Sequence, residues 1–204
     1  MSLHSIDFYY DFGSPNAYLA WKALQGTITR TGLVVNMKPA LIGGIFKITG
    51  NSPPWQSAAN IKSKLSYIEI EMKRFISEHH LTKFKFNKIF PMNTLLAMRG
   101  AIVSQELGIH NAYISLMFKS IWENNEDISN PENFIKLLND DGMDGCKILK
   151  ATNNKEIKEK LKKLTGESIK RGVFGLPTFF WQDEIYFGKE CISQIEISIT
   201  GENK

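Results

Sequence analysis

The sequence predicts an α/β fold in which a small domain, assembled from both ends of the chain, carries a large all-helical insertion. Residues 4–39 alternate between strand, helix and strand patterns, whereas residues 41–155 repeat their apolar positions at helical spacing. Residues 172–199 have the pattern of a β-hairpin followed by a helix. We therefore expect residues 1–40 and 156–204 to form the α/β domain and residues 41–155 to form the insertion.

The first unit is a strand, a helix and a second strand. Alternating apolar side chains predict a strand over residues 4–10, and apolar residues at helical spacing predict a helix over residues 15–30. Gly32 is placed to end this helix, and residues 33–39 then predict the second strand. Because the connections are short, we expect the two strands to be parallel neighbours in one sheet.

Ser14 stands where this helix should begin, and Pro15 follows at the first helical position. The free N–H groups and the positive dipole end of a helix start favour an anion. A serine followed by a proline is also an ordinary helix start, because the hydroxyl caps the backbone and the proline is preset for helical φ. Spacing alone leaves both interpretations open, and caps are the commoner of the two.

The insertion is a series of helices separated by turn residues. The expected helices cover residues 61–76, 94–107, 113–122, 131–138 and 152 or 153 to about 170, with a loop or short helix at 45–49. Residues 84–86 are expected to form a short extended piece. Residues 140–145 predict a turn, since they lack the alternating ligands and terminal glutamate of a calcium loop. The adjacent histidines His79 and His80 have no converging ligands, so no metal site is predicted.

The C-terminal section starts with a glycine-flanked turn that leads through Leu176 and Pro177 into an apolar strand. Proline cannot donate a ladder hydrogen bond, so it belongs at the start of a strand. A cis Leu176–Pro177 bond would explain a proline between a glycine turn and a strand. Residues 182–184 predict the hairpin turn, residues 185–187 the second strand, and residues 190–199 a final helix.

The composition is that of a soluble globular protein, and neither a nucleic-acid partner nor a membrane span is expected. The net charge is +4 and the lysines are spread along the chain, so no nucleic-acid partner is expected. No apolar run approaches the roughly 20 residues that span a bilayer. The N-terminus lacks a basic start followed by an apolar stretch, so we expect no signal peptide and a cytoplasmic location. The two cysteines, Cys146 and Cys191, form no metal or disulfide pattern and are expected to be free thiols.

The strand, helix, strand start and the hairpin and helix at the end, with a cis-proline candidate before the hairpin, are the plan of a thioredoxin-like fold. Several motifs are more specific. They are Tyr10-Asp11-Phe12-Gly13-Ser14-Pro15, Lys47-Ile48-Thr49-Gly50-Asn51, Phe90-Pro91-Met92-Asn93-Thr94 and Val173-Phe174-Gly175-Leu176-Pro177-Thr178-Phe179, with the spaced residues Lys64, Tyr67, Glu71 and Arg74. This ordered set covers nearly the whole chain. It resembles the 2-hydroxychromene-2-carboxylate isomerase family, which is related to kappa-class glutathione transferases within the DsbA-like branch.

The resemblance implies that glutathione is the cofactor and supplies a thiolate. The chain has no cysteine at the start of the first helix, so thiol–disulfide exchange through that motif is excluded. The resemblance instead assigns Ser14 to donate a hydrogen bond to the glutathione sulfur. A pKa depression of roughly two units, about 2.7 kcal/mol, makes such a thiol mostly ionised at neutral pH. A charge-assisted hydrogen bond and a helix dipole together supply that much.

Further site residues follow from the same resemblance. The Leu176 backbone would pair with the glutathione peptide as an added strand, while Asn51 and the turn Phe187-Gly188-Lys189-Glu190 would complete the cofactor site. Lys47 would face the second substrate. Each has a plain structural alternative, since Asn51 suits a turn, Lys47 a solvated surface and Gly188 a hairpin. Glu190 and Cys191 stand where the family usually has aspartate and arginine, which bears on glutathione affinity and substrate identity more than on the fold.

The activity that the resemblance implies is a glutathione-dependent isomerisation, in which a thiolate adds reversibly to an activated double bond of an aromatic-derived 2-oxo acid during aromatic compound catabolism. A kappa-like transferase that conjugates glutathione to electrophiles is the alternative on the same scaffold. A redox-silent module that holds a peptide in the thioredoxin-like groove is a third hypothesis. The expected partners are a small aromatic or electrophilic substrate and, by resemblance, a second copy of the chain in a homodimer.

Overall fold

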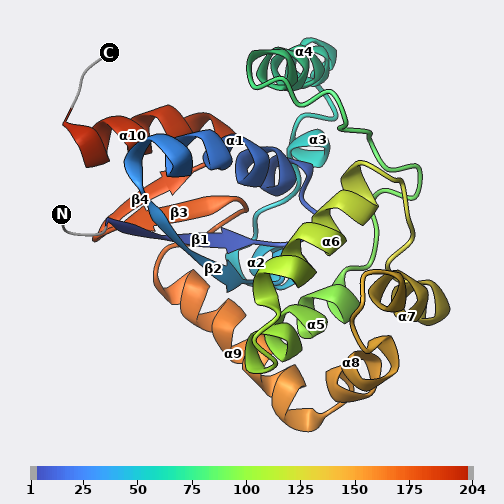
Figure 1. The fold of residues 1–204 in the computed structure, drawn as a ribbon. Coiled ribbons are helices and arrows are strands. Elements are labelled where there is room, and N and C mark those ends of the chain that lie inside the picture. The colour runs from blue at the N-terminus through green and yellow to red at the C-terminus, as the bar shows by residue number, and fades with distance from the viewer. Residues whose placement is uncertain (1–3, 202–204) are drawn as a thin grey trace.

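A computed structural model describes residues 4–201 and contains one four-stranded sheet (Figure 1). The strand order is β2-β1-β3-β4, with β1 at Ser5–Tyr10, β2 at Val34–Pro39, β3 at Thr178–Trp181 and β4 at Glu184–Phe187. β1 pairs with β2 in parallel and with β3 in antiparallel orientation, and β3 and β4 form a hairpin. The expected parallel pair and C-terminal hairpin are therefore confirmed.

Helices cover both faces of this sheet. Figure 1 shows α1 (Pro15–Thr31) and α10 (Ile192–Thr200) on one face, with α2 (Ile42–Thr49) and α9 (Lys155–Lys170) on the other. The remaining helices lie between β2 and β3 in the sequence. They are α3 (Pro54–Ser57), α4 (Lys62–Glu78), α5 (Leu95–Glu106), α6 (His110–Trp122), α7 (Pro131–Asp140) and α8 (Gly145–Thr152). The short 3₁₀ turn η1 (Lys189–Cys191) follows β4 and leads into α10.

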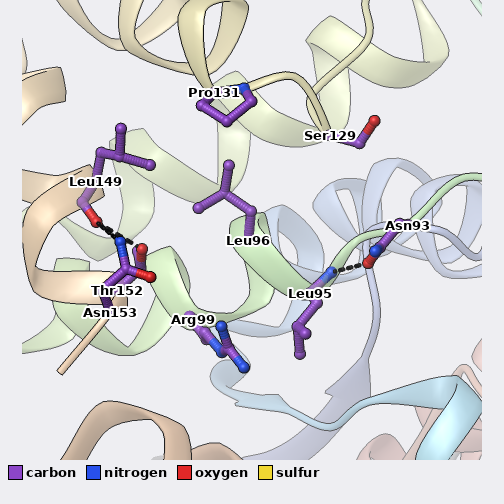
Figure 2. Close-up of a pocket in the computed structure, with 9 residues that line it drawn as sticks. All are labelled: Asn93, Leu95, Leu96, Arg99, Ser129, Pro131, Leu149, Thr152 and Asn153. Carbon is purple, nitrogen blue, oxygen red and sulfur yellow. Dashed lines mark hydrogen bonds between the residues drawn. The ribbon is translucent and has the colours of Figure 1, made fainter. Parts of the chain in front are cut away.

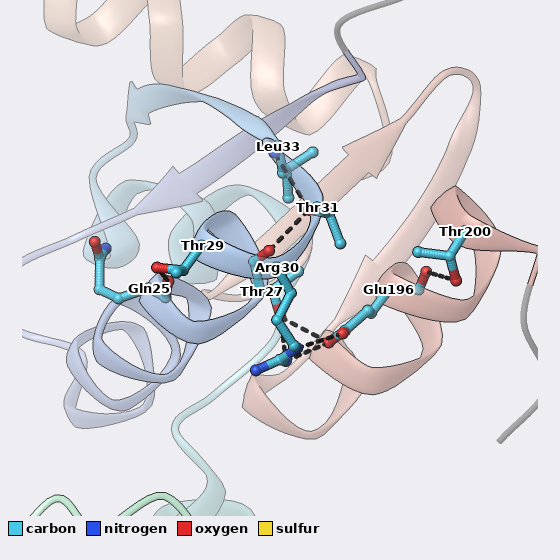
Figure 3. Close-up of polar contacts among 8 residues, drawn as sticks. All are labelled: Gln25, Thr27, Thr29, Arg30, Thr31, Leu33, Glu196 and Thr200. Carbon is cyan, nitrogen blue, oxygen red and sulfur yellow. Dashed lines mark hydrogen bonds and ion pairs between the residues drawn. The ribbon is translucent and has the colours of Figure 1, made fainter. Parts of the chain in front are cut away.

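A polar contact joins the two helices on the first face. Arg30 at the end of α1 forms a bidentate pair with Glu196 of α10, with its Nε and Nη2 atoms 2.7 and 2.6 Å from the two carboxylate oxygens (Figure 3). Thr27 donates a third hydrogen bond to the same carboxylate at 3.0 Å. Two parallel guanidinium–carboxylate bonds fix both distance and orientation, so this contact sets how α10 lies along α1.

Local signals account for the helix ends that the sequence predicts. Gly32 adopts a left-handed φ of 68° and closes α1, where its N–H donates to the Ile28 carbonyl. The Asn130 side chain accepts hydrogen bonds from two N–H groups at the start of α7, with Pro131 in the first helical position. These residues act within one turn of the backbone, which is why they are readable without a structure.

The structure differs from the expectations in several elements of the insertion. Residues 145–152 form α8, for which the sequence predicted no helix, and α9 begins at Lys155 rather than at residue 152 or 153. Residues 84–86 are irregular and belong to no strand. Helix α4 forms where the apolar spacing predicted a helix, and Phe75 is its one buried residue. Two proline bonds are cis: Leu176–Pro177, as predicted, and Phe90–Pro91, which was not.

The main core is continuous between the sheet and the insertion. Tyr10 and Phe12, at the end of β1, contact the ring of Phe118 in α6 at centroid distances of 5.8 and 4.9 Å. Trp122 of α6 is fully buried and donates its indole N–H to the Phe12 carbonyl at 2.9 Å. The insertion thus packs directly behind the loop that leads to Ser14. The domain boundaries at residues 40/41 and 155/156 stay a prediction.

Candidate functional site

Ser14 connects the start of α1 to the cis-proline turn. Its hydroxyl is the N-cap of α1, accepts a hydrogen bond from Ala17 N–H at 3.2 Å, and donates one to the Leu176 carbonyl at 3.1 Å. The side chain is almost fully buried, with 4% of the residue exposed. The capping interpretation of Ser14 is therefore confirmed. The single hydroxyl proton points at Leu176, so donating to a ligand would require the hydroxyl to rotate.

The cis Leu176–Pro177 turn presents backbone groups beside Ser14. The Pro177 carbonyl accepts from Gly188 N–H at 3.0 Å, which ties the turn to the end of the hairpin. The Leu176 N–H donates to no acceptor within the described part of the chain. A free N–H group beside an exposed segment is the kind of donor that an extended peptide uses when it adds to a sheet edge.

Asp11 holds the loop that precedes Ser14, although it was not singled out as a site residue. The carboxylate is fully buried, and one oxygen accepts from Gly13 N–H at 2.9 Å and from the Thr94 hydroxyl at 2.7 Å. The other oxygen accepts from Ile42 N–H at 2.9 Å, at the start of α2. Burial raises the pKa of Asp11 above its ordinary value, and the hydrogen bonds from Gly13, Ile42 and Thr94 oppose that rise.

A second group of predicted residues gathers at the rim of this region. The Asn51 amide donates to the Phe174 carbonyl at 2.8 Å, which links the residue after α2 to the turn before Leu176. The rings of Phe174 and Phe187 lie 4.5 Å apart, and each residue is more than 40% exposed. A Cβ on Gly175 would lie 2.9 Å from the Phe187 ring, so a larger residue there would push that ring aside. Asn51 and Phe187, far apart in the sequence, are thus brought together.

Lys189 and Glu190 have different environments, although they are neighbours. The Lys189 side chain is 1% exposed and its ammonium contacts Glu71 at 2.6 Å and the Glu190 carboxylate, while the Glu190 side chain is 56% exposed. Burial pushes the pKa of Glu190 upward, but the hydrogen bond and charge of Lys189, a backbone hydrogen bond and the contact with Glu71 together leave that pKa below its ordinary value. Gly188, before them, has a φ of 88°, which only glycine adopts readily.

Lys47 is not joined to the other predicted residues by any recorded contact. It lies exposed in the last turn of α2, and the described residues give it no hydrogen bond or ion pair. Its assignment to the second substrate therefore stays a prediction.

The sequence reasoning missed Asp11 and Thr94 as residues that organise the site. Both stand inside motifs that were singled out, next to Ser14 and after Asn93, so their position was a signal. Their burial and mutual hydrogen bond were not predictable, because 83 residues separate them in the chain.

Two partly open cavities lie away from the predicted site residues. One of about 240 Å³ is lined by α5, α8 and the segments before α5 and α7, including Leu96, Arg99 and Asn153 (Figure 2). A second, of about 380 Å³, lies between α1, β2 and α6. Neither includes Ser14, Asn51 or Leu176.

The described part of the chain offers neither a grouped metal site nor a membrane span. Within residues 4–201, no three His, Cys, Asp or Glu side chains are grouped so that they could hold a metal ion. None of the helices in that range has both the length and the apolar character needed to cross a bilayer. Cys146 is exposed and Cys191 buried, and both are free thiols.

Comparison with known proteins places the chain among thioredoxin-like proteins. The family model of the DsbA-like thioredoxin domain matches residues 5–199. Glutathione S-transferase kappa 1 of Rattus norvegicus is 26% identical over 178 residues, covering 85% of this chain and 79% of the rat protein. The 2-hydroxychromene-2-carboxylate isomerase of Pseudomonas putida is 26% identical over 195 residues, covering 94% and 92%. A solved structure of such an isomerase has a TM-score of 0.79 at 24% identity, covering 96% and 94%, which confirms the predicted fold class.

Proposed function

The chain belongs to the DsbA-like thioredoxin-domain family, and we propose that it is a glutathione-dependent isomerase of the 2-hydroxychromene-2-carboxylate isomerase type. The observation that carries the proposal is the contact between the Ser14 hydroxyl and the Leu176 carbonyl at 3.1 Å. It places a hydroxyl at a helix start beside the cis-proline turn, where dithiol oxidoreductases have a reactive cysteine. The named relatives are isomerases and glutathione transferases, which supports an enzyme.

The residues around Ser14 fit glutathione. The Leu176 N–H has no partner within the described residues, so it is available to a peptide carbonyl. The half-exposed rings of Phe174 and Phe187 offer an apolar surface beside it. Glu190, 56% exposed in its side chain, offers a carboxylate to an ammonium group.

In this proposal, bound glutathione supplies a thiolate that adds to the activated double bond of an aromatic-derived 2-oxo acid and leaves after the bond has rotated. Ser14 turns its hydroxyl proton from the Leu176 carbonyl to the sulfur and stabilises the negative charge there. The N-terminal dipole of α1 acts in the same direction, by about 0.3 to 1 kcal/mol. Asp11 keeps the loop of Ser14 in place, and Lys47 draws the substrate carboxylate.

A kappa-like glutathione transferase is the second candidate. The similarity to the rat kappa-class enzyme, at the same 26% identity as to the isomerase, favours it. Both activities need the same thiolate and the same Ser14 contact. They differ in the second substrate, since a transferase forms a lasting carbon–sulfur bond with an electrophile and an isomerase does not.

The test measures glutathione binding by calorimetry and the ultraviolet absorbance of the bound thiolate. We expect the parent to bind glutathione and Ser14→Ala to raise the pKa of the bound thiol by one to two units, because about 1.4 kcal/mol of stabilisation is lost per unit. Asn130→Ala is the matched control, since it removes a helix cap far from this residue. Isomerisation of a 2-hydroxychromene-2-carboxylate supports the first candidate, and a covalent product with a haloarene the second.

The absence of any binding heat with glutathione would contradict both candidates and leave a peptide-binding module. A Ser14→Ala variant with an unchanged thiol pKa would contradict the role of the hydroxyl. The expected homodimer is also part of the proposal, and sedimentation velocity tests it directly.

A further inference from the structure

The starting observation is a buried ammonium shared by two carboxylates. Lys189 is 1% exposed, contacts Glu71 at 2.6 Å and Glu190, and lies 5.1 Å from the centroid of the Phe75 ring. One positive and two negative charges leave the group with a formal charge of −1. Burial raises the pKa of Glu71 above its ordinary value; Lys189 opposes that rise, whereas the charge and hydrogen bond of the neighbouring Glu190 add to it.

The two carboxylates face different surroundings. The Glu71 side chain is 28% exposed and comes from α4, whereas the Glu190 side chain is 56% exposed and stands next to Gly188 at the end of the hairpin. Glu71 is thus the inner partner of Lys189 and Glu190 the outer one. A buried lysine must keep a counter-charge, because an uncompensated buried charge costs several kcal/mol.

Helix α4 depends on this contact. Phe75 is its one buried residue, and the Glu71–Lys189 pair is the ion pair that the structure records between α4 and the rest of the described chain. Phe75 itself lies under the Lys189 ammonium. The position of Glu71 is therefore set by Lys189. Glu71 in turn neutralises part of the positive charge of Lys189, which would otherwise be balanced by Glu190 alone.

We propose that Glu71 is a positioning residue that makes the site specific for a thiol peptide with a free ammonium group, by balancing Lys189 so that Glu190 keeps a net negative charge for the ligand. This rests on the proposed function. Without Glu71, Lys189 and Glu190 form a neutral pair, and the attraction for an ammonium group is lost. Glu71 acts through Lys189 and does not touch the ligand.

The experiment compares two ligands in calorimetry at pH 7: glutathione and glutaryl-cysteinyl-glycine, which lacks only the ammonium group. For the parent, glutathione is expected to bind at least tenfold more tightly. In Glu71→Gln this ratio is expected to fall below threefold. Glu69→Gln removes an equal charge from an exposed position on the same helix and is expected to leave the ratio unchanged.

A second variant, Lys189→Gln, is expected not to lower the preference for the ammonium ligand. Lys189→Gln leaves both carboxylates without their cation, so the preference for the ammonium ligand is expected to be as large as in the parent or larger. If Glu71→Gln fails to fold, the Lys189→Gln variant still tests the inference. Glu71→Asp keeps the charge and is expected to keep the ratio within threefold of the parent.

Equal weakening of both ligands in Glu71→Gln, with the ratio preserved, would overturn the inference, because a purely structural role of α4 predicts that result. A ratio that falls in Lys189→Gln would overturn it as well. A parent that binds neither ligand instead overturns the proposed function, and the inference with it. The failure of the inference alone is thus recognised by normal glutathione binding in the parent.

Discussion

Asp11 has an unusual environment for a charged side chain, because it is fully buried and forms no ion pair with a cation among residues 4–201. Its three hydrogen bonds come from three separate segments: its own loop, the start of α2 and the start of α5. Hydrogen bonds to charged groups contribute more than neutral ones, about 1.5 to 3 kcal/mol each. The residue thus fixes the loop of Ser14 relative to two helices.

Asp11→Asn is expected to destabilise the protein by roughly 1 to 3 kcal/mol, because an amide presents one acceptor oxygen and leaves a buried donor unpaired. The measurement is urea unfolding at pH 7. Asp141→Asn, in an exposed turn, is the control and is expected to stay within about 0.5 kcal/mol of the parent. Equal stability of the two variants would contradict the role assigned to Asp11.

The stability difference between parent and Asp11→Asn is also expected to depend on pH. The folded-state pKa of Asp11 is raised, mainly by burial, above its unfolded value. Its contribution to stability is therefore fully present below the unfolded pKa and is lost as the pH rises through the folded pKa. The advantage of the parent should grow between pH 7 and pH 4 in urea unfolding series. A difference that shrinks toward acid pH would contradict the assigned direction.

The two cysteines are expected to react at very different rates. Burial raises the pKa of Cys191 to about 12, whereas Cys146 is exposed. Only a thiolate that the reagent can reach reacts quickly. At pH 8, a disulfide reagent such as dithionitrobenzoate should therefore titrate one thiol quickly in the native protein and two after denaturation. Cys146→Ser should remove the fast phase, and a fast phase that survives would contradict the assignment.

At the scale of elements, glycines in two helices have opposite surroundings. Gly100 lies in α5, and a Cβ there would come within 2.1 Å of the Tyr113 hydroxyl, which is itself hydrogen-bonded to the Ala97 carbonyl at 2.8 Å. Gly166 lies in α9, and a Cβ there would meet nothing within 4 Å. The first glycine allows α5 and α6 to approach closely, and the second only lowers helix propensity.

Gly100→Ala is accordingly expected to destabilise the protein by about 1 to 3 kcal/mol through overpacking, despite the better helix propensity of alanine. Gly166→Ala, the matched control, should stabilise it by roughly 0.5 to 1 kcal/mol. Thermal or urea unfolding of both variants measures the two effects. A stabilising Gly100→Ala would contradict the close helix contact at this position.

The sequence predicted those elements that are defined by capping, glycine or proline residues acting on the backbone close to their own position. Asn130 with Pro131, Gly32, and the proline at the hairpin entry each act locally, so α7, α1 and the hairpin were recovered. α8 was missed because its eight residues follow a run of aspartates and glycines that reads as a turn, although Asp144 caps it. α4 was found from its apolar spacing, but that spacing says nothing of what would cover it.

The candidate site was predictable to a similar extent. Ser14 as a helix cap and the cis Leu176–Pro177 bond followed from residue types, and the structure brings the two together. The burial of Lys189 between Glu71 and Glu190 could not be predicted in this way. Glu71 lies 118 residues away in the sequence, and a lysine after a hairpin normally lies in solvent. Long-range electrostatic partners have no signature in a single sequence.

At the scale of the whole molecule, the aromatic core decides how the two predicted domains behave. Rings from β1, α1 and α6 contact one another without a break, as the contacts of Phe118 with Tyr10, Phe12 and Trp21 show. Two units that share a core of this kind lose the same contacts when either unfolds. Cooperative unfolding of the sheet and the insertion therefore follows, with α4 as the exception because it buries one side chain.

Native-state hydrogen exchange tests this expectation residue by residue. Amides of β1 and β3 should exchange with the same opening free energy as those of α5 and α6, because all four elements open only with the common core. Amides of α4 should exchange at a lower free energy, since Phe75 and the Glu71–Lys189 pair are its recorded anchors. Glu71→Gln should lower the α4 value further and leave β1 unchanged, whereas Glu69→Gln should change neither. Separate opening of α5 and α6 at a lower free energy than the sheet would instead indicate that the insertion folds as an independent unit.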